Sequence, residues 1–350
     1  GYPVHVISRP LPGDRQFDGT VPYAVCRSAH GEESSWRRWR YLSSEIDRLG
    51  SDIIFSNVLG SGSVLGPLLA RRKNKRFLIS AHGMDLSRRA PDGKLFSTGL
   101  RSLRQWISYR GADRILCHCS RVHEILTTRK VDPARLCLLF PGVSRDFLEA
   151  TPGDRLEIRR RWDLEGKQVV LTLCRLVQRK GIHLMLAAIA RMAPRHPELV
   201  YLIAGDGPYR STLEQLTQRL GIQSRVIFAG PVSQTEKLEC YDAADLFAMP
   251  NIDLEGDCEG FGLVFVEAAA RGLPAIGGRA GGVPDAIVDG ETGLLVEPGD
   301  VDGLTTALES LLSDPGRRRE MGIAARRRVS EHFTWEKTAD QLIQKVLEAE

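Results

Sequence analysis

The sequence has no long hydrophobic run. The longest uncharged run in its first part, residues 53–70, has 18 residues, and eight of these are Gly, Ser, Asn or Pro. Such a run is too polar to span a bilayer. No segment has the composition of a secretory signal peptide either. We therefore expect neither an integral membrane protein nor a secreted one.

Cysteine patterns that indicate a disulfide framework or a zinc site are also missing. The seven cysteines are odd in number and irregularly spaced. A chain of 350 residues is also large enough to fold without disulfide bonds. Cys117-His118-Cys119 resembles half of a metal site, but no second ligand pair follows at zinc-site spacing. The triplet Glu255–Asp257 is too short to define an acidic metal site. We therefore expect reduced cysteines and no metal ion.

Two common nucleotide fingerprints are absent as well. The stretch "IAGDGPYR" lacks the last glycine of a Gly-x-Gly-x-x-Gly motif, because Arg210 occupies that position. The stretch "GSGSVLG" misses the same spacing by one residue, and no Walker A sequence is present. These absences exclude the usual signatures of a nicotinamide dinucleotide enzyme and of a P-loop nucleotidase.

Positive charge is concentrated in the first part of the chain. Residues 1–150 hold 24 Lys and Arg against 14 Asp and Glu, a balance of +10, and the remainder holds 24 against 30, a balance of −6. This asymmetry indicates an anionic partner such as a membrane surface or a phosphorylated acceptor, although a solvated basic face explains it equally well. We expect a cytoplasmic protein with peripheral contact at the inner membrane face, and no nucleic-acid partner.

Short apolar runs alternate with amphipathic stretches along the whole chain. Continuous apolar runs are typical of parallel strands that helices cover on both faces, so the alternation predicts an α/β protein. A change in composition near residues 147–165 predicts the boundary between two domains. The predicted strands are Val4–Ser8, Ile53–Ser56, Phe77–Ser80, Arg114–Cys117, Val169–Leu173, Val200–Ala204, Val226–Ala229 and Leu246–Met249.

Two segments of the first half allow a structural and a functional interpretation. The predicted helix Trp36–Leu49 places Trp36, Trp39, Leu42, Ile46 and Leu49 on one face. Arginines beside that face are typical of a helix in a membrane interface, but such a stripe more often packs in a core, and we predict core. The basic run "RRKNKR" at residues 71–76 is predicted to be a solvated loop.

Two cations follow the predicted strand Val169–Leu173. Arg175 and Lys180 precede a helix that we expect to begin near Gly181. Cations at the carboxyl end of a strand, ahead of a helix N-terminus, favour binding of a phosphate or diphosphate. Ordinary surface cations at a helix entry are the alternative.

Two carboxylates, Glu259 and Glu267, flank a Gly-Phe-Gly turn, and a helix is predicted to begin near Gly262. Eight residues of ideal helix span about 12 Å and rotate about 80°, whereas glycosidase carboxyl pairs lie roughly 5–9.5 Å apart. The spacing therefore favours two contacts to one elongated ligand over an acid–base pair. In the first half, His82 follows a predicted strand, where parallel sheets place their sites, although a lone histidine at such a position is more often structural.

Together these motifs resemble the retaining glycosyltransferases of family 4. The pieces that carry the resemblance follow the family's order and cover most of residues 165–345. They are "CRLVQRKGI", "IAGDGP", "VIFAGPV", "EGFGLVFVEAAARGLPAIG", "AGGVPDAIVDGETGLLVEPGD" and "HFTWEKTADQLI". The first half matches more loosely, through "SAHGMD", "ADRILCHCS" and "LFPGVSRDF".

The resemblance implies a GT-B fold, in which two Rossmann-like parallel-sheet domains face a cleft. Residues 1–147 would form the acceptor-side domain and residues 148–330 the nucleotide-sugar domain, and the helix within residues 331–350 would pack back on the first domain. The family normally begins with a strand, a Gly-Gly loop and a helix ahead of the strand that matches "PVHVISR". We therefore expect the first βα unit to be missing here.

The resemblance also implies a role for each motif residue. Arg175 and Lys180 would neutralise the departing donor diphosphate. Glu259 would bind hydroxyls of the transferred sugar, Glu267 those of the ribose, and His82 would contact the sugar from the acceptor-side domain. Further nucleotide-sugar contacts would come from the main chain at Gly262, Leu263, Val264, Gly281, Gly282 and Val283 and, near the base, from Pro231 and Val232.

The implied activity is retaining transfer of a hexosyl unit from a UDP- or GDP-sugar. The acceptor would be a glycan or a lipid-linked or phosphorylated molecule of cell-surface polysaccharide or glycolipid synthesis. The nucleotide sugar is a substrate, and neither a cofactor nor a metal ion is expected. A nucleotide-sugar epimerase of the same fold and a truncated, non-catalytic nucleotide-sugar-binding protein stay open as alternatives.

Overall fold

A computed structural model describes residues 3–8, 24–27, 35–57, 61–82, 96–151, 153–254 and 257–347. The chain divides into two compact units, Gly1–Ser80 with Gly99–Ile115 and Ala81–Thr98 with Leu116–Glu350. Of the segments discussed above, residues 58–60 of the uncharged run, residues 83–85 of "SAHGMD" and residues 255–256 of the acidic triplet lie outside the described ranges.

The larger unit contains a six-stranded sheet with the order β12-β11-β10-β7-β8-β9. All neighbouring strands in it are parallel. Its central strands are buried along their length because both faces are covered. The strands are β7 (Gln168–Leu173), β8 (Leu199–Ala204), β9 (Val226–Gly230), β10 (Leu246–Met249), β11 (Ala275–Gly278) and β12 (Gly293–Val296).

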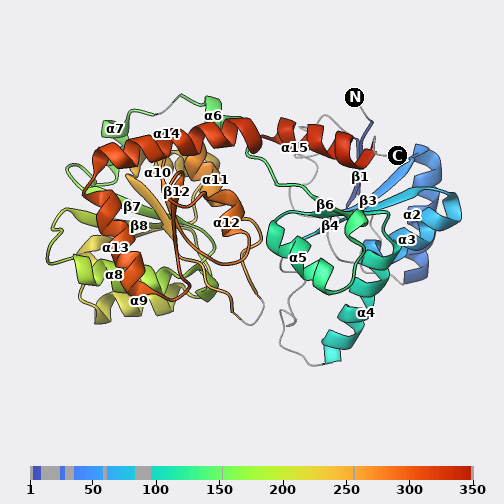
Figure 1. Cartoon of the computed structure of the whole chain (residues 1–350), viewed down its shortest axis with the longest axis horizontal. Helices are drawn as coiled ribbons and strands as arrows, with labels where there is room; N and C mark the ends of the chain where they lie inside the picture. Colours follow the sequence, from blue (N-terminus) through green and yellow to red (C-terminus); the bar gives the residue numbers. More distant parts are fainter. Residues whose placement is uncertain are drawn as a thin grey trace. The chain divides into compact units, whose positions relative to one another are not determined.

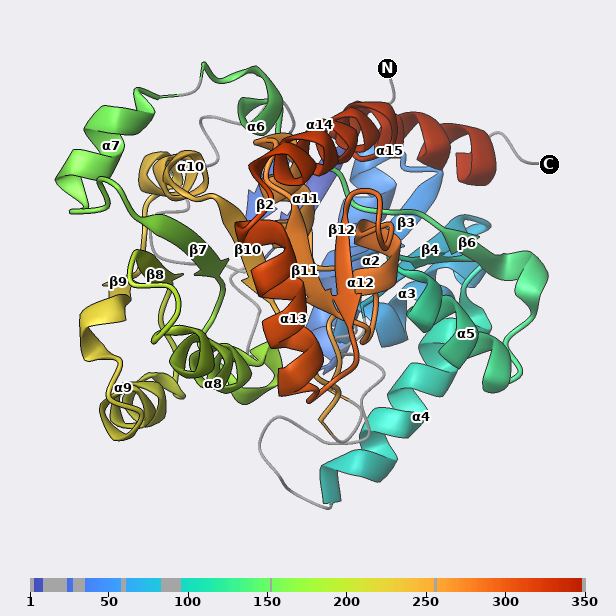
Figure 2. The same cartoon turned by 60° about the vertical axis from the view of Figure 1, so that its left-hand side comes forward.

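Helices cover both faces of this sheet (Figures 1 and 2). One layer consists of α8 (Ile182–Met192), α9 (Arg210–Arg219) and α13 (Val301–Leu312). The other layer consists of α10 (Gln234–Ala243), α11 (Leu263–Ala270) and α14 (Pro315–His332). Shorter elements in this part of the chain are α6 (Asp146–Glu149), α7 (Arg155–Arg161), η3 (Gln178–Lys180), η4 (Gln223–Arg225) and α12 (Val283–Ala286).

The described part of the first half contains a parallel strand pair and a separate four-stranded sheet. A pair is formed by β1 (His5–Ser8) and β2 (Ala24–Arg27). A four-stranded sheet has the order β3-β4-β5-β6 and consists of β3 (Ile53–Ser56), β4 (Arg76–Ala81), β5 (Arg114–Cys117) and β6 (Leu136–Leu138). The helical elements here are α2 (Ser35–Leu49), α3 (Ser61–Lys73), α4 (Phe96–Gly111), α5 (Ser120–Thr128) and η2 (Pro133–Arg135).

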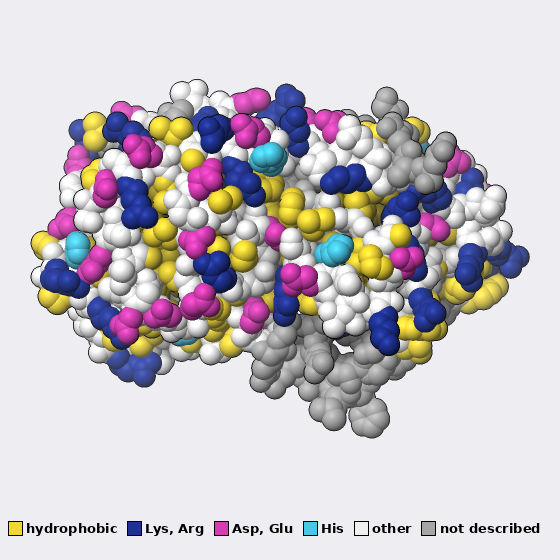
Figure 3. All heavy atoms as spheres, viewed as in Figure 1, with side chains coloured by type: hydrophobic (Ala, Val, Ile, Leu, Met, Phe, Trp, Pro, Cys, Tyr) yellow, Lys and Arg dark blue, Asp and Glu magenta, His cyan; other side chains and the backbone are white. Residues whose placement is uncertain are grey.

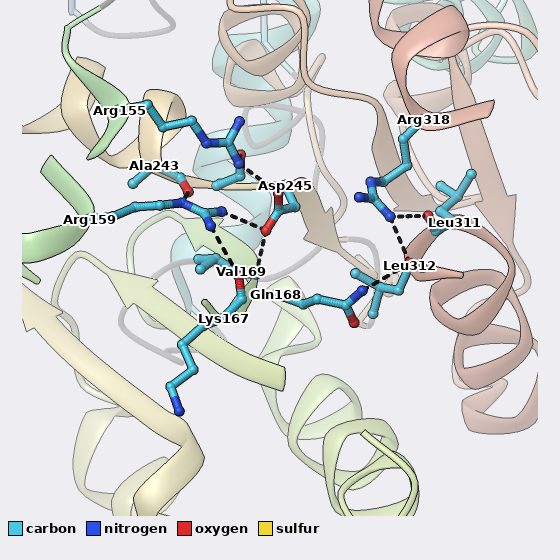
Figure 4. Close-up of polar contacts among 11 residues, drawn as sticks. Arg155, Arg159, Lys167, Gln168, Val169, Ala243, Asp245, Leu311, Leu312 and Arg318 are labelled. Carbon is cyan, nitrogen blue, oxygen red and sulfur yellow. Dashed lines mark hydrogen bonds and ion pairs between the residues drawn. The ribbon is translucent and has the colours of Figure 1, made fainter. Parts of the chain in front are cut away.

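A half-buried carboxylate ties α7 to the sheet (Figure 4). Asp245, just before β10, accepts hydrogen bonds from Arg155 at 2.6 Å and Arg159 at 2.7 Å. The same carboxylate accepts the backbone N–H of Val169 at 2.8 Å. Hydrogen bonds to charged groups are among the stronger ones, so Asp245 fixes the start of the unit's central strands.

The last described elements of the chain are α15 (Trp335–Leu342) and the π-helical turn η5 (Ile343–Leu347). Thr338 of α15 donates a hydrogen bond to the carbonyl of Phe140 at 2.9 Å. Val143 donates to the carbonyl of Phe333 at 2.8 Å, and Arg145 pairs with Glu336 at 2.5 Å. The C-terminal segment therefore binds the segment that follows β6. Packing on the first domain stays a prediction.

The α/β class and all eight predicted strands are confirmed, but three details were wrong or missed. Trp36 is 63% exposed, so the stripe of α2 is not uniformly core, although Ile46 is buried. The run at residues 71–76 is not a loop, because its first three residues end α3 and Arg76 begins β4. Strands β2, β6, β11 and β12 were not predicted. Among the described residues, no helix has the length and apolar composition needed to cross a bilayer.

Candidate functional site

The candidate site forms where β7 and β10 end. These strands are parallel neighbours, so the loops that follow them leave the sheet at the same edge. The first loop contains Arg175 and ends in η3 with Lys180. The second leads to Glu259 and then to α11. The sheet thereby brings together the cation and the carboxylate that the sequence placed 79 residues apart.

Three donors converge on one oxygen of Glu259. Its Oε2 accepts a hydrogen bond from Lys180 Nζ at 2.5 Å, from Arg179 Nη1 at 2.8 Å and from Asn251 Nδ2 at 2.8 Å. Lys180 and Glu259 are 8% and 9% exposed, and Asn251 is 1% exposed. A buried pair with this geometry keeps the carboxylate ionised and fixes its plane. Oε2 is thereby used by the protein.

The electrostatics of Glu259 follow from two opposing effects. Burial alone would raise the pKa of its carboxyl group, because it disfavours the charged form. The charges of Lys180 and Arg179, and their hydrogen bonds, outweigh burial and lower the pKa below the usual 4.5. Glu259 is therefore an acceptor of hydrogen bonds at neutral pH and has no proton to donate as an acid.

Arg175 has a different environment from Lys180. Its side chain is exposed, and no described residue forms an ion pair or side-chain hydrogen bond with it. The two predicted phosphate ligands therefore differ: Arg175 is available to solvent, whereas Lys180 is bound to the site's own carboxylate.

Glu267 lies in α11 and is held at both oxygens. Lys237 Nζ donates to Oε1 at 2.7 Å, and the Tyr241 hydroxyl donates to Oε2 at 2.8 Å. Burial, and next the charge of Glu267, raise the pKa of Tyr241 well above its usual value, so the phenol stays protonated and donates. Lys237 also lies over the ring of Phe147, 5.0 Å from its centroid.

The predicted main-chain contacts lie beside Glu259. Gly262, with φ 82°, precedes α11, so Leu263 and Val264 begin the helix, where the first N–H groups have no intrahelical acceptor. Gly281 has φ 56°, and a side chain there would overlap the carbonyl oxygen of Glu259.

In the second glycine loop, residues 281–283, part of the main chain is already hydrogen-bonded within the protein. The N–H of Gly282 donates to the Glu259 carbonyl at 3.0 Å, and that of Val283 donates to Ala280 at 3.2 Å. These two N–H groups therefore already have acceptors within the chain. The loop packs against the main chain of the Glu259 loop.

The remaining predicted residues lie outside these two clusters. Pro231 and Val232 follow β9 and precede α10, whose first residues form a capping box with Ser233. His82 directly follows β4, half-buried, and its ring centroid lies 4.7 Å from that of His118. Burial lowers the pKa of His118, whose Nδ1 lies 2.9 Å from the Leu139 carbonyl. Within the described residues, no group of three or more His, Cys, Asp or Glu could hold a metal ion.

Solved structures share this fold. A glycosyltransferase from Rickettsia africae superposes with a TM-score of 0.82 and 17% identity over 100% of this chain and 92% of that one. Anabaena HepE, solved in complex with UDP and glucose, superposes with a TM-score of 0.81 and 19% identity over 99% of this chain and 92% of that one. These likenesses show the GT-B fold.

Family models and sequence relatives narrow the class. The model described as "Glycosyltransferase Family 4" matches residues 1–147, and "Glycosyl transferases group 1" matches residues 154–328. A GDP-mannose-dependent alpha-(1-6)-phosphatidylinositol monomannoside mannosyltransferase of Mycolicibacterium smegmatis is 34% identical over 276 residues, 78% of this chain and 70% of that protein. The chain belongs to glycosyltransferase family 4 and is a hexosyltransferase that uses a nucleotide sugar.

Other relatives match over different lengths. A D-inositol 3-phosphate glycosyltransferase of Mycobacterium marinum is 31% identical over 356 residues, 97% of this chain and 70% of that protein. The chain spans 55% of the Mycobacterium tuberculosis relative, which has the same name as the M. smegmatis mannosyltransferase and is 37% identical over 211 residues.

Sequence reasoning missed four residues that the structure places in the site. Arg179 is next to Lys180, and Asn251 comes just after the strand that precedes Glu259, so both had a positional signal. Lys237 and Tyr241 lie 30 and 26 residues from Glu267, and only the packing of α10 against α11 reveals them.

Proposed function

We propose that this chain transfers a hexosyl unit, with retention, from a UDP- or GDP-sugar to a glycan or lipid-linked acceptor. The proposal rests on two carboxylates, Glu259 and Glu267, whose hydrogen-bond partners differ. Glu259 lies beside Lys180 and Arg179, and Glu267 is presented from α11 with both oxygens oriented. Between them lies a helix N-terminus, which attracts phosphate. This sequence of contacts suits the sugar, the diphosphate and the ribose of one donor.

The names of the relatives set the order in which donors should be tested. The mannosyltransferase relatives are described as GDP-mannose-dependent, and Anabaena HepE was also solved with UDP-glucose. GDP-mannose is therefore the first donor to test and UDP-glucose the second. Pro231 and Val232 would lie near the base, and His82 would contact the sugar.

The proposed chemistry places charge on the departing diphosphate. The bond between the sugar carbon and the diphosphate oxygen breaks, and the acceptor oxygen forms its bond on the same face, with its proton passing to the leaving phosphate. Catalysis of this kind depends on positioning and on neutralising the leaving group. Arg175 and Lys180 would neutralise it, and Glu259 would hold hydroxyls of the sugar. No metal ion or cofactor is required in this proposal.

A lipid-linked or phosphorylated acceptor agrees with the surface of the smaller unit. Its exposed hydrophobic residues include Trp36 and Trp106, at 63% and 57% exposure. Each ring lies under an arginine, Arg40 at 4.9 Å and Arg110 at 5.3 Å. Figure 3 shows basic and hydrophobic side chains beside one another over the part of the chain that Figure 1 colours blue. This surface suits an anionic membrane, so we place the enzyme at the cytoplasmic face of a membrane, in polysaccharide or glycolipid synthesis.

The test is a donor screen followed by turnover. Ligand-observed binding across GDP-, UDP- and ADP-sugars is expected to select one nucleotide, and donor hydrolysis should follow for that donor. Lys180→Ala is expected to lower turnover by about 100-fold or more, since it removes charge stabilisation of the leaving group. Arg160→Ala is the control, because Arg160 forms an exposed pair with Glu165. Binding to none of the donors, or normal turnover of Lys180→Ala, would contradict the proposal.

A further inference from the structure

Arg179 contacts the loop after β10 at three separate points. Its backbone carbonyl accepts the N–H of Ile252 at 2.9 Å. Its guanidinium forms ion pairs with Asp257, Nε to Oδ1 at 3.4 Å, and with Glu259, Nη1 to Oε2 at 2.8 Å. One residue of η3 thus touches the beginning and the end of the segment that presents Glu259. Leu254 and Asp257, which hydrogen-bond to each other's main chain, close this segment.

The backbone around Arg179 is fixed by a glycine. Gly181 follows η3 with φ 72°, a conformation that favours glycine. A side chain at Gly181 would overlap the carbonyl oxygen of Pro250, so the turn packs main chain against main chain. The position of the Arg179 side chain relative to Glu259 is therefore set by the two loops and not by a flexible surface contact.

We propose that Arg179 is a positioning residue: it holds Glu259 oriented toward the transferred sugar when the donor diphosphate draws Lys180 away. This inference rests on the proposed function. Lys180 and Arg179 share one oxygen of Glu259, and an incoming diphosphate competes for the more mobile ammonium. Arg179 is anchored on its other side by Asp257 and stays.

Arg179 differs from a phosphate ligand in its surroundings. Its side chain is 14% exposed and lies between two carboxylates, which would repel a phosphate. Arg175, in contrast, is exposed and has no ion-pair partner among the described residues. The two arginines are therefore expected to affect different ligands: Arg175 the diphosphate, and Arg179 the sugar through Glu259.

The test compares two ligands on two arginine variants. Calorimetry measures the Kd of the nucleotide sugar selected by the screen and of its nucleoside diphosphate alone. Arg179→Ala is expected to lower the affinity for the nucleotide sugar by about tenfold, since a hydrogen bond to a charged group contributes roughly this factor. The affinity for the nucleoside diphosphate is expected to fall by less than about threefold, because this ligand lacks the sugar that Glu259 binds. Arg175→Ala should lower the affinity for both ligands by the same factor. Arg179→Lys should recover part of the lost affinity, because it restores the charge.

The pH dependence of kcat/KM gives a second measurement. If Arg179 had only a structural role, its replacement would not shift this pH profile. Arg179 lowers the pKa of Glu259, so its loss raises that pKa, and the acid limb of the profile should move to higher pH in Arg179→Ala. Arg160→Ala, the exposed-pair control, should leave the limb in place. Thermal unfolding confirms that each variant is folded.

The two failures are distinguishable. Wild-type protein that binds no nucleotide sugar overturns the proposed function and this inference with it. If the wild-type protein binds the donor, only the inference can fail. It fails if Arg179→Ala lowers the affinity for both ligands equally or for neither. An acid limb that does not move in Arg179→Ala overturns it as well.

Discussion

Glu267 depends on a lysine and a tyrosine from a neighbouring helix. Lys237 and Tyr241 lie one turn apart on α10 and each bind one carboxylate oxygen. Each oxygen keeps a second lone pair, which is where two ribose hydroxyls would donate. The orientation of the carboxylate is therefore determined before the ligand arrives, and preorganisation of this kind lowers the entropic cost of binding.

Tyr241→Phe is expected to weaken nucleotide binding by about tenfold, because it removes one hydrogen bond to a charged group. Calorimetry with the nucleoside diphosphate measures the change. Tyr201→Phe is the matched control: Tyr201 is equally buried, and its hydroxyl pairs with Thr172 at 2.7 Å, away from Glu267. That variant should lower stability and leave nucleotide affinity unchanged. Equal affinities for Tyr241→Phe and wild type would contradict the role given to Tyr241.

The helical elements η3 and α8 depend on the left-handed glycine between them. Gly181 combines φ 72° with close approach to the Pro250 carbonyl, so a methyl group there meets both backbone strain and a steric overlap. The displacement that relieves the overlap would also move Lys180 and Arg179, which directly precede Gly181.

Gly181→Ala is therefore expected to destabilise the fold by about 3 kcal/mol or more, as a sum of strain and overlap, and to lower donor affinity. Gly166→Ala is the control, since Gly166 has a similar φ of 68° but open space around its would-be side chain. It should cost only about 1–2 kcal/mol from backbone strain. Urea unfolding of both variants measures the difference. A Gly181→Ala variant no less stable than Gly166→Ala would refute this account.

The sequence predicted elements well where side chains carried the pattern. Continuous apolar runs such as Val169–Leu173 marked the central strands, helical spacing marked α2, and residues of high helix propensity marked α11. Strand β11, "AIGG", was missed because glycine lowers the strand signal, although in the structure its glycines permit close packing, Gly278 lying against the main chain of Asn251.

The site was predicted to the extent that family motifs marked it. Glu259, Glu267 and Lys180 could be found in this way, whereas their partners could not. Lys237 and Tyr241 reach Glu267 through tertiary packing, and Asn251 is an ordinary polar residue after a strand. That Lys180 would be bound to Glu259 was not predictable, because spacing along the chain does not say which loops meet beyond a sheet.

The uneven distribution of charge along the chain predicts binding to anionic membranes. The basic first half carries exposed tryptophans beside arginines, a combination that is enriched at lipid interfaces. The protein is expected to sediment with vesicles that contain about one third anionic lipid and to be released as salt rises from about 0.05 to 0.5 M, because surface charges are screened.

Replacing both Trp36 and Trp106 with Ala should weaken this vesicle binding by about tenfold, because two apolar side chains are lost from the interface. Trp335→Ala is the control, since Trp335 is 51% exposed but lies in the other unit. Vesicle binding that does not depend on salt concentration would argue against a membrane-binding surface on the basic half. So would an equal loss of vesicle binding in Trp335→Ala.

The pairing of Lys180 with Glu259 also bears on which anions the site would reject. Within this cluster, two positive side chains face Glu259 and Asp257, so their formal charges cancel. A cell is rich in inorganic phosphate and in nucleotides that carry no transferable hexose, and both would fill a pocket lined by cations alone. An anion without hydroxyl groups would have to break the ion pair between Lys180 and Glu259. It would give Glu259 no hydrogen-bond donor to replace Lys180. Internal neutrality thus acts as a filter, which competition between donor and inorganic phosphate would reveal as weak inhibition.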